Sequence, residues 1–258
     1  MAGLFDKQAA IYAEARPNFP EKWFSMLSAL TSHHSLAWDV GTGNGQAAIN
    51  IAQHYDKVIA TDISEEQLKH AIHDPRIQYF HTPSSMSDNE IISLIGDENS
   101  VDLVTVSVAV HYFDLERFYS QVKRLLRNPG GIIAVWTYNI IQVNSEFDPV
   151  MQRFYESTLP FWSPKAKIAF DCYKTLPFPF ESVGVGCEGQ PKILDMPKQM
   201  SFEGMLGLLR SWSAVNTAKD QGVDLLSENV VKRFENAWGG SDVVRTVIFK
   251  TYMIAGKV

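Results

Sequence analysis

Cysteine is scarce in this sequence, which has only Cys172 and Cys187 among 258 residues. Two thiols cannot build a disulfide framework for a chain of this size, and neither has the Cys or His neighbours that zinc spacing requires. We therefore expect reduced thiols and no metal site.

Long apolar runs and an excess of positive charge are missing as well. No stretch approaches the roughly 18 consecutive apolar residues of a membrane span, and the opening residues 1–6 lack the basic and apolar regions of a signal peptide. The 23 Lys and Arg are outnumbered by 29 Asp and Glu, and no strong cation cluster is present to neutralise nucleic-acid phosphates. We expect a cytoplasmic protein, monomeric or homodimeric, with no membrane or nucleic-acid partner.

The composition that remains is that of a packed protein. With 45% hydrophobic and 20% charged residues the chain does not resemble a disordered one. Its length allows one large domain or a domain with an inserted cap.

Between residues 36 and 138 short apolar runs alternate with amphipathic segments. Strands are predicted at 36–40, 58–62, 77–80, 101–110 and 131–138, and helices at 21–30, 46–54, 65–72, 88–95 and 115–126. This alternation predicts an α/β, Rossmann-like, doubly wound and mostly parallel sheet. The run at 101–110 should lie mid-sheet because its two faces are both apolar, and Asp102 should face solvent at its entrance.

After Tyr138 the pattern becomes irregular and rich in proline and aromatic residues. Helices are predicted there only at 202–212 and 226–238, followed by a run of β-formers at 243–258. We therefore divide the chain into N-terminal lid helices at 1–30, a cofactor-binding core at 31–138, an acceptor-binding cap at 139–241 and a closing strand of the core sheet at 242–258.

A glycine-rich turn, Asp39-Val-Gly-Thr-Gly43-Asn-Gly45, joins the first predicted strand to a helix. Glycines there allow close backbone approach, and a helix N-terminus offers N–H groups to a ligand. The dinucleotide fingerprint fails because Gln46 occupies the position of its third glycine, and no P-loop Lys follows. Asp62 ends the second strand, where a carboxylate can accept hydrogen bonds from ribose hydroxyls.

This assembly of acid, glycine turn and strand-two acid resembles the class I S-adenosylmethionine-dependent methyltransferases. Several further segments are similar to the trans-aconitate methyltransferase-like group, which carries a methyltransferase type 11 domain: Phe5, Ala9, Tyr12, Arg16-Pro17 and Pro20; A-V-H-Y-F-D at 109–114; L-R-N-P-G-G at 126–131; and S-W-S at 211–213. Tyr112 stands where the group usually has Trp, and Asn128 is an extra polar residue in the turn.

The resemblance implies S-adenosyl-L-methionine as cofactor and S-adenosyl-L-homocysteine as product. It assigns the following residues to cofactor binding: Asp39, Gly41, Thr42, Gly43, Asp62, Ile63, Ser84, Ser85, Val106, Ser107 and Ala109. Among these, Asp39 and the backbone of Gly41 and Gly43 would hold the methionine end, and Asp62 the ribose. The candidate acceptor-binding residues are Tyr12, Arg16, His111, Tyr112, Trp136, Trp162, Arg210 and Trp212, and His111 is the candidate catalytic residue.

The methyl acceptor is less well defined, because in-line methyl transfer depends on alignment and exclusion of water and needs few particular side chains. The resemblance favours O-methylation of a small carboxylate, for which Arg16, Arg153, Lys165 and Arg210 are candidate clamps. A hydroxyl or amine acceptor, with His111 as a base in the hydroxyl case, is the alternative. The same pattern also admits a nucleotide-cofactor oxidoreductase, which Gln46 disfavours, and a non-methylating protein of the same fold.

Overall fold

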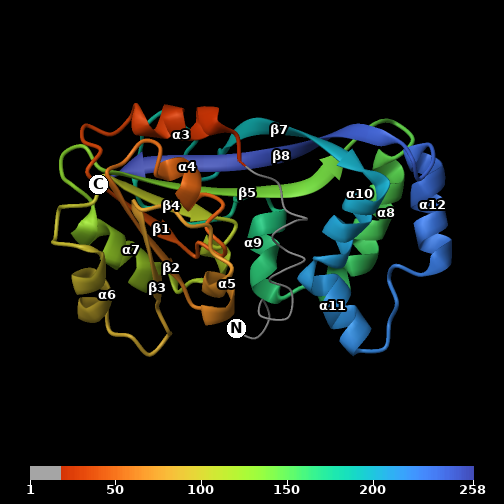
Figure 1. Cartoon of the computed structure of the whole chain (residues 1–258), viewed down its shortest axis with the longest axis horizontal. Helices are drawn as coiled ribbons and strands as arrows, with labels where there is room; N and C mark the ends of the chain where they lie inside the picture. The colour runs from red at the N-terminus through yellow and green to blue at the C-terminus, as the bar shows by residue number, and fades with distance from the viewer. Residues whose placement is uncertain (1–18) are drawn as a thin grey trace.

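One mixed sheet runs through the computed structural model, which describes residues 19–258 (Figure 1). Its parallel part consists of β1 (Leu36–Val40), β2 (Lys57–Asp62), β3 (Ile77–His81), β4 (Leu103–Ser107) and β5 (Ile132–Gln142). The strand order is β3-β2-β1-β4-β5-β8-β6, with β4 in the middle as expected. This order confirms the Rossmann-like α/β fold class and places the carboxyl ends of β1 and β4 side by side.

The antiparallel part of the sheet is larger than the sequence suggested. β8 (Val244–Lys257) lies antiparallel along β5, while β6 (Glu181–Ser182) and β7 (Lys192–Ser201) pair with successive stretches of β8. Two strands of the expected cap therefore belong to the sheet. β7 pairs only with β8 among the described strands and contains Pro197, a residue that sheets tolerate at an edge.

The helices form two groups at opposite ends of the sheet (Figure 1). Around the parallel strands lie α3 (Glu21–Ser28), α4 (Ala48–Ile51), α5 (Glu65–Lys69), α6 (Asp88–Ile95) and α7 (Leu115–Leu125). At the far ends of β5, β7 and β8 lie α8 (Asp148–Thr158), α10 (Phe202–Arg210), α11 (Ser213–Asp220) and α12 (Glu228–Trp238), with α9 (Lys167–Phe170) between the groups. None of the described helices has the length and apolarity needed to cross a bilayer.

Several helix predictions need correction. The helix expected at 46–54 is regular only over α4, and the helix expected at 65–72 ends at Lys69. α8, α9 and α11 were not expected, although Met151, Phe154 and Thr158 give the buried face of α8 a helical spacing. The start of α5 is as predicted, because the Ser64 side chain accepts a hydrogen bond from the Gln67 N–H.

Helix α3 is part of the core and not of a lid. Trp23, Phe24 and Leu27 are buried, and the ring of Phe24 meets Trp136 edge-on at 6.1 Å. The same apolar cluster continues to Phe234 of α12, so one core joins both ends of the sheet. The rest of the expected lid, up to residue 18, lies outside the described residues.

Asp102 does not face solvent as expected. Its side chain is fully buried, pairs with Arg127 Nε at 2.5 Å and accepts the backbone N–H groups of Ser35 and Leu36. A carboxylate can be buried when such donors replace its water. Asp102 thereby ties the start of β1 to the segment after α7.

Candidate functional site

The glycine turn after β1 has the backbone that its sequence predicts. Gly41 and Gly43 have φ angles of +66° and +58°, values that L side chains rarely adopt. The N–H groups of Gly41 and Thr42 both donate to the Thr61 carbonyl, at 2.8 and 3.0 Å. A Cβ on Gly41 would lie 2.7 Å from the Ala109 Cβ, so glycine there also allows β1 and the β4 loop to approach closely.

Asp62 connects this turn to the loop that follows β2. Its two carboxylate oxygens accept the Gly43 N–H and the Ser64 N–H, each at 2.8 Å. Burial raises the pKa of Asp62, although these N–H donors favour the ionised form. A carboxylate has about four acceptor positions, so lone pairs remain with which Asp62 can accept a ligand hydroxyl.

Asp39 holds the glycine turn through hydrogen bonds from two threonine hydroxyls. Its buried carboxylate accepts the hydroxyls of Thr42 and Thr105, each at 2.6 Å. Burial raises the pKa of Asp39 to about 6. Neither Asp39 nor Thr42 lines the cavity described next, so in this structure both lie behind the surface that a ligand would touch.

A cavity of about 430 Å³ opens beside the turn, within the size range of small-molecule sites. We call it the donor cavity. Six predicted cofactor residues line it: Gly41, Gly43, Asp62, Ile63, Ser84 and Ala109. The remaining wall is largely apolar, including Trp38, Val40, Ile91, Phe113 and Phe118.

The residues that line the donor cavity fit the adenosine part of S-adenosylmethionine. Asp62 offers acceptors suited to ribose hydroxyls, and the apolar wall suits a purine ring. Gly43 leaves room for the ligand, because a Cβ there would meet no protein atom closer than 3.8 Å.

Besides Asp39 and Thr42, three further predicted cofactor residues do not line the donor cavity, namely Ser85, Val106 and Ser107. Val106 is fully buried in the core, because both faces of β4 are covered. Val108, two residues further on, has a φ of +55°, a strained value for a β-branched residue. This bend lies between β4 and η1 (Val110–Tyr112).

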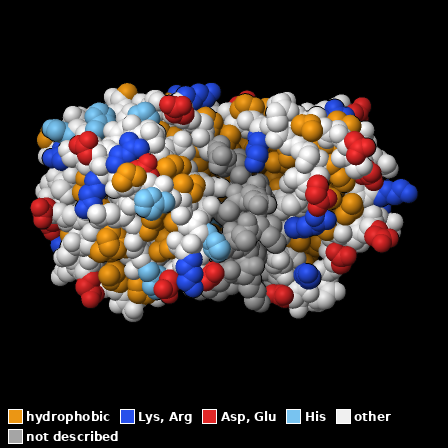
Figure 2. Space-filling model, viewed as in Figure 1, with side chains coloured by type: hydrophobic (Ala, Val, Ile, Leu, Met, Phe, Trp, Pro, Cys, Tyr) orange, Lys and Arg blue, Asp and Glu red, His pale blue; other side chains and the backbone are white. Residues whose placement is uncertain are grey.

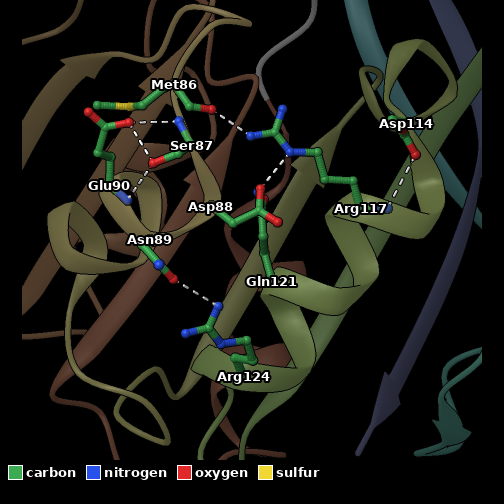
Figure 3. Close-up of polar contacts among 9 residues, drawn as sticks. All are labelled: Met86, Ser87, Asp88, Asn89, Glu90, Asp114, Arg117, Gln121 and Arg124. Carbon is green, nitrogen blue, oxygen red and sulfur yellow. Dashed lines mark hydrogen bonds and ion pairs between the residues drawn. The ribbon is translucent and has the colours of Figure 1, made fainter.

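A polar network connects α7 to the loop before α6 (Figure 3). Arg117 of α7 donates through Nε to Asp88 Oδ1 and through Nη2 to the Met86 carbonyl, both at 2.5 Å. Gln121 donates to the same oxygen of Asp88 at 2.8 Å, and Ser87 with Glu90 forms a capping box at the start of α6. Because Arg117 and Gln121 also line the cavity, this network fixes one of its walls.

A second cavity, of about 90 Å³, shares Tyr112 with the donor cavity; we call it the acceptor cavity. Four predicted acceptor residues line it: His111, Tyr112, Trp162 and Trp212. Sequence reasoning missed other lining residues, among them Thr137, Tyr138, Asn139, Tyr155 and Phe170. Thr137 and Tyr138 lie in the predicted strand, but Asn139 lies in an extension of β5, Tyr155 on α8 and Phe170 on α9, none of which was expected.

His111 lies at the inner end of the acceptor cavity and is 5% exposed. Its Nδ1 lies 3.2 Å from the hydroxyl of Tyr173, and its ring is 4.2 Å from that of Tyr112, centroid to centroid. Burial lowers the pKa of His111 to about 4. The ring is therefore neutral at physiological pH.

Two predicted acceptor residues lie elsewhere. Trp136 is fully buried in the core between β4 and β8 and lines neither cavity. Arg210 lines neither cavity, because its guanidinium pairs with Glu203 on the exposed side of α10. Tyr12 and Arg16 lie outside the described residues.

A Rossmann-like sheet with a glycine turn, a strand-two carboxylate and an adjoining second cavity defines an enzyme that transfers a group between a nucleoside cofactor and a small molecule. Comparison with known proteins specifies the group. Residues 38–135 match the family description of a methyltransferase domain.

Two similar proteins extend this match over nearly the whole chain. A Dictyostelium discoideum protein named as a methyltransferase is 30% identical over 255 residues, covering 95% of this chain and 91% of its own. The solved structure of an Anaeromyxobacter dehalogenans protein titled as a type II methyltransferase is 30% identical, with a TM-score of 0.80 and coverage of 94% and 97%. A Saccharomyces cerevisiae protein named as an S-adenosylmethionine-dependent methyltransferase is 30% identical over 143 residues, 51% of this chain and 45% of its own.

The chain belongs to the S-adenosylmethionine-dependent methyltransferases. This confirms the predicted enzyme class and cofactor. The finer resemblance to the trans-aconitate group and the individual site residues stay predictions.

Proposed function

We propose that this methyltransferase O-methylates the carboxylate of a small organic acid bound in the acceptor cavity. S-adenosylmethionine supplies a methyl group on a sulfonium and leaves as S-adenosylhomocysteine. Because Tyr112 lines both cavities, a donor in one and an acceptor in the other would meet beside this residue. Such alignment can supply most of the rate enhancement of a displacement reaction.

The low basicity of His111 carries the proposal. A hydroxyl acceptor must lose a proton during the reaction and benefits from a base whose pKa is near neutral. His111, with a pKa of about 4, is a poor proton acceptor. No Asp, Glu, Lys, Arg or Cys among residues 19–258 lines the acceptor cavity. A carboxylic acid, with an ordinary pKa near 4, is already ionised and needs no base.

Neutral donors would hold the acceptor in this proposal. Three of the four expected clamps do not line the acceptor cavity, and the fourth, Arg16, lies outside the described residues. Arg153 is exposed on α8, Lys165 donates to the Tyr112 carbonyl at 3.0 Å, and Arg210 pairs with Glu203. The serine and tyrosine hydroxyls around the cavity are uncharged groups that can donate hydrogen bonds instead. The aromatic wall favours an acid with a flat or apolar body.

The acceptor class can be tested with matched compounds and a pH profile. An aromatic acid, the phenol and the amine with the same ring should be compared by S-adenosylhomocysteine formation. We expect turnover of the acid, with a kcat/KM that is flat from about pH 6 to 8 and falls below about pH 5 as the acceptor is protonated. Turnover of the phenol alone, rising about tenfold per pH unit, would replace this proposal with methylation of a hydroxyl.

Two results would point outside this proposal. Preference for the amine would indicate N-methylation. Binding of S-adenosylhomocysteine without turnover of any compound would indicate a non-methylating role.

The cytoplasmic location, the oligomeric state and the absence of a nucleic-acid partner stay predictions. On the face shown in Figure 2, the described Lys and Arg are interspersed with Asp and Glu and form no broad basic patch.

A further inference from the structure

Tyr173 is a buried residue that family resemblance does not assign to the site, yet it touches His111. Its side chain is fully buried, and its hydroxyl lies 3.2 Å from His111 Nδ1. Burial holds the pKa of the Tyr173 hydroxyl well above its ordinary value, so the group keeps its proton. Thr137 of β5 lies near the Tyr173 side chain, and its own hydroxyl donates to the Tyr138 carbonyl at 3.5 Å.

The backbone around Tyr173 is strained but well held. Cys172 and Tyr173 have φ angles of +58° and +59°, two successive left-handed residues that are not glycine. Such strain persists only where surrounding contacts fix it, and it is concentrated at functional sites. Here the Tyr173 N–H donates to the Ile168 carbonyl at 3.1 Å, and Asn139 donates to the Phe170 carbonyl at 3.3 Å.

The burial of the Tyr173 hydroxyl indicates the direction of its hydrogen bond to His111. The hydroxyl keeps its proton, and among the described residues His111 Nδ1 is the acceptor with which it makes a hydrogen bond. Donation in the opposite direction, from an Nδ1–H to the Tyr173 oxygen, would leave this buried hydroxyl proton without such a partner. A neutral imidazole carries one proton, and a ring whose Nδ1 accepts must carry it on Nε2. The Tyr112 ring packs against that of His111, and Lys165 donates to the Tyr112 carbonyl.

We propose that Tyr173 is a positioning residue for methyl transfer, whose hydroxyl holds His111 in the tautomer that carries its proton on Nε2. His111 then presents an N–H donor to the acceptor cavity that it lines. Such a donor orients an oxygen of the acceptor and cannot remove a proton from it. The expected effect on methyl transfer rests on the proposed function, because an N–H donor on His111 suits an ionised carboxylate acceptor. The tautomer of His111 does not depend on which acceptor is methylated.

Nitrogen-15 NMR of labelled histidines tests the tautomer without any substrate. The sequence has seven histidines, and His111→Gln identifies the signals of this one by their loss. We expect wild-type His111, with and without S-adenosylhomocysteine, to show an unprotonated Nδ1 and a protonated Nε2 at pH 7. A protonated Nδ1 in the wild type would overturn the proposal, whatever the acceptor proves to be.

Two matched tyrosine variants test the positioning role. Tyr173→Phe should give a mixture of tautomers and lower kcat/KM for the acceptor about tenfold, the effect of one lost hydrogen bond. Its affinity for S-adenosylhomocysteine should stay unchanged. Tyr119→Phe is the control, because Tyr119 is also buried and its hydroxyl donates to the Pro177 carbonyl at 2.7 Å, without touching His111.

The outcomes separate positioning from general stability. Equal kinetic losses in Tyr173→Phe and Tyr119→Phe, or an unchanged His111 tautomer in Tyr173→Phe, would overturn the positioning role. A wild-type tautomer as expected, together with turnover of a phenol only, would overturn the proposed function and leave the tautomer assignment in place.

Discussion

Asp39 lies one layer behind the donor cavity, where its charge depends on what the cavity holds. Burial raises its pKa to about 6, and the family resemblance places it near the methionine end of the cofactor, which carries an ammonium group. A cation nearby favours the ionised carboxylate, so binding should release a proton near pH 6. Affinity for S-adenosylhomocysteine should therefore rise about tenfold between pH 5 and pH 7.

Calorimetric titrations at pH 5, 6 and 7 measure this change, and Asp39→Asn should abolish it. His81→Gln is the control, because His81 lies near Asp62 and its Nε2 is 3.0 Å from the Ile63 carbonyl oxygen. Affinity that does not depend on pH, or a dependence lost only in His81→Gln, would show that Asp39 stays in one charge state during binding.

Gly43 offers a test of where the cofactor lies. Gly43 and Gly184 both have positive φ angles, and a Cβ on either would meet no protein atom closer than 3.8 Å. Alanine at either position should cost about 1 kcal/mol of unfolding free energy through backbone strain. Only Gly43 lines the donor cavity, so Gly43→Ala alone should weaken S-adenosylhomocysteine binding, by tenfold or more. Equal affinities of the two variants would exclude close approach of the ligand at Gly43.

Residues whose role depends on local spacing could be identified from the sequence. Gly41, Gly43 and Asp62 lie where a strand–turn–helix pattern places them, and the structure brings all three to one cavity. Asp102 and Arg210 could not be interpreted in this way. Each has an ion-pair partner, Arg127 or Glu203, that no motif connects to it, so burial and pairing decide its role.

At the scale of elements, Arg117 joins α7 to the loop before α6 (Figure 3). Its bonds to Asp88 and the Met86 carbonyl are partly exposed, so Arg117→Ala should lower the unfolding free energy by less than about 1 kcal/mol. The loop wall of the donor cavity would lose its anchor. We expect affinity for S-adenosylhomocysteine to fall about fivefold.

Arg124→Ala is the matched control for this prediction. Arg124 lies two turns further along α7 and pairs with Glu98, but it does not line the donor cavity. Calorimetry should give this variant wild-type affinity. Equal losses of affinity in both variants would mean that α7 as a whole, and not the Arg117 anchor, supports the site.

The elements that sequence patterns missed share a physical cause. β7 has exposed charged residues and a proline. An edge strand can carry both, because it does not need a strict alternation of apolar and polar residues and does not use all of its backbone N–H groups to pair with a neighbouring strand. β5 was predicted too short because the polar Asn139 interrupts its apolar run; Asn139 and Ile140 line the acceptor cavity, and Ile141 returns to the core. The parallel strands were predictable because burial on both faces makes them continuously apolar.

At the scale of the whole molecule, β5 and β8 run from the cofactor-binding half into the helices around the acceptor cavity (Figure 1). One apolar cluster follows them, from Trp23 of α3 to Phe234 and Trp238 of α12. A shared sheet and a shared core leave neither half able to unfold without exposing the other. We therefore expect the described part of the chain to unfold in a single cooperative transition.

Phe234→Ala tests this coupling from the end remote from the cofactor. The Phe234 ring is fully buried, with its centroid 5.7 Å from that of Phe147 and 5.4 Å from that of Phe154, so its loss should cost about 3 to 5 kcal/mol of unfolding free energy. Urea unfolding can be followed both by circular dichroism and by the loss of bound S-adenosylhomocysteine. We expect the urea midpoints of both signals to be lower in the variant than in the wild type, and by the same amount. The reason is that a ligand that binds only the folded chain reports the same unfolding equilibrium. If the circular dichroism trace split into two steps and the ligand left only in the second, the cofactor half would be an independent folding unit, and the shared sheet would not couple the two cavities.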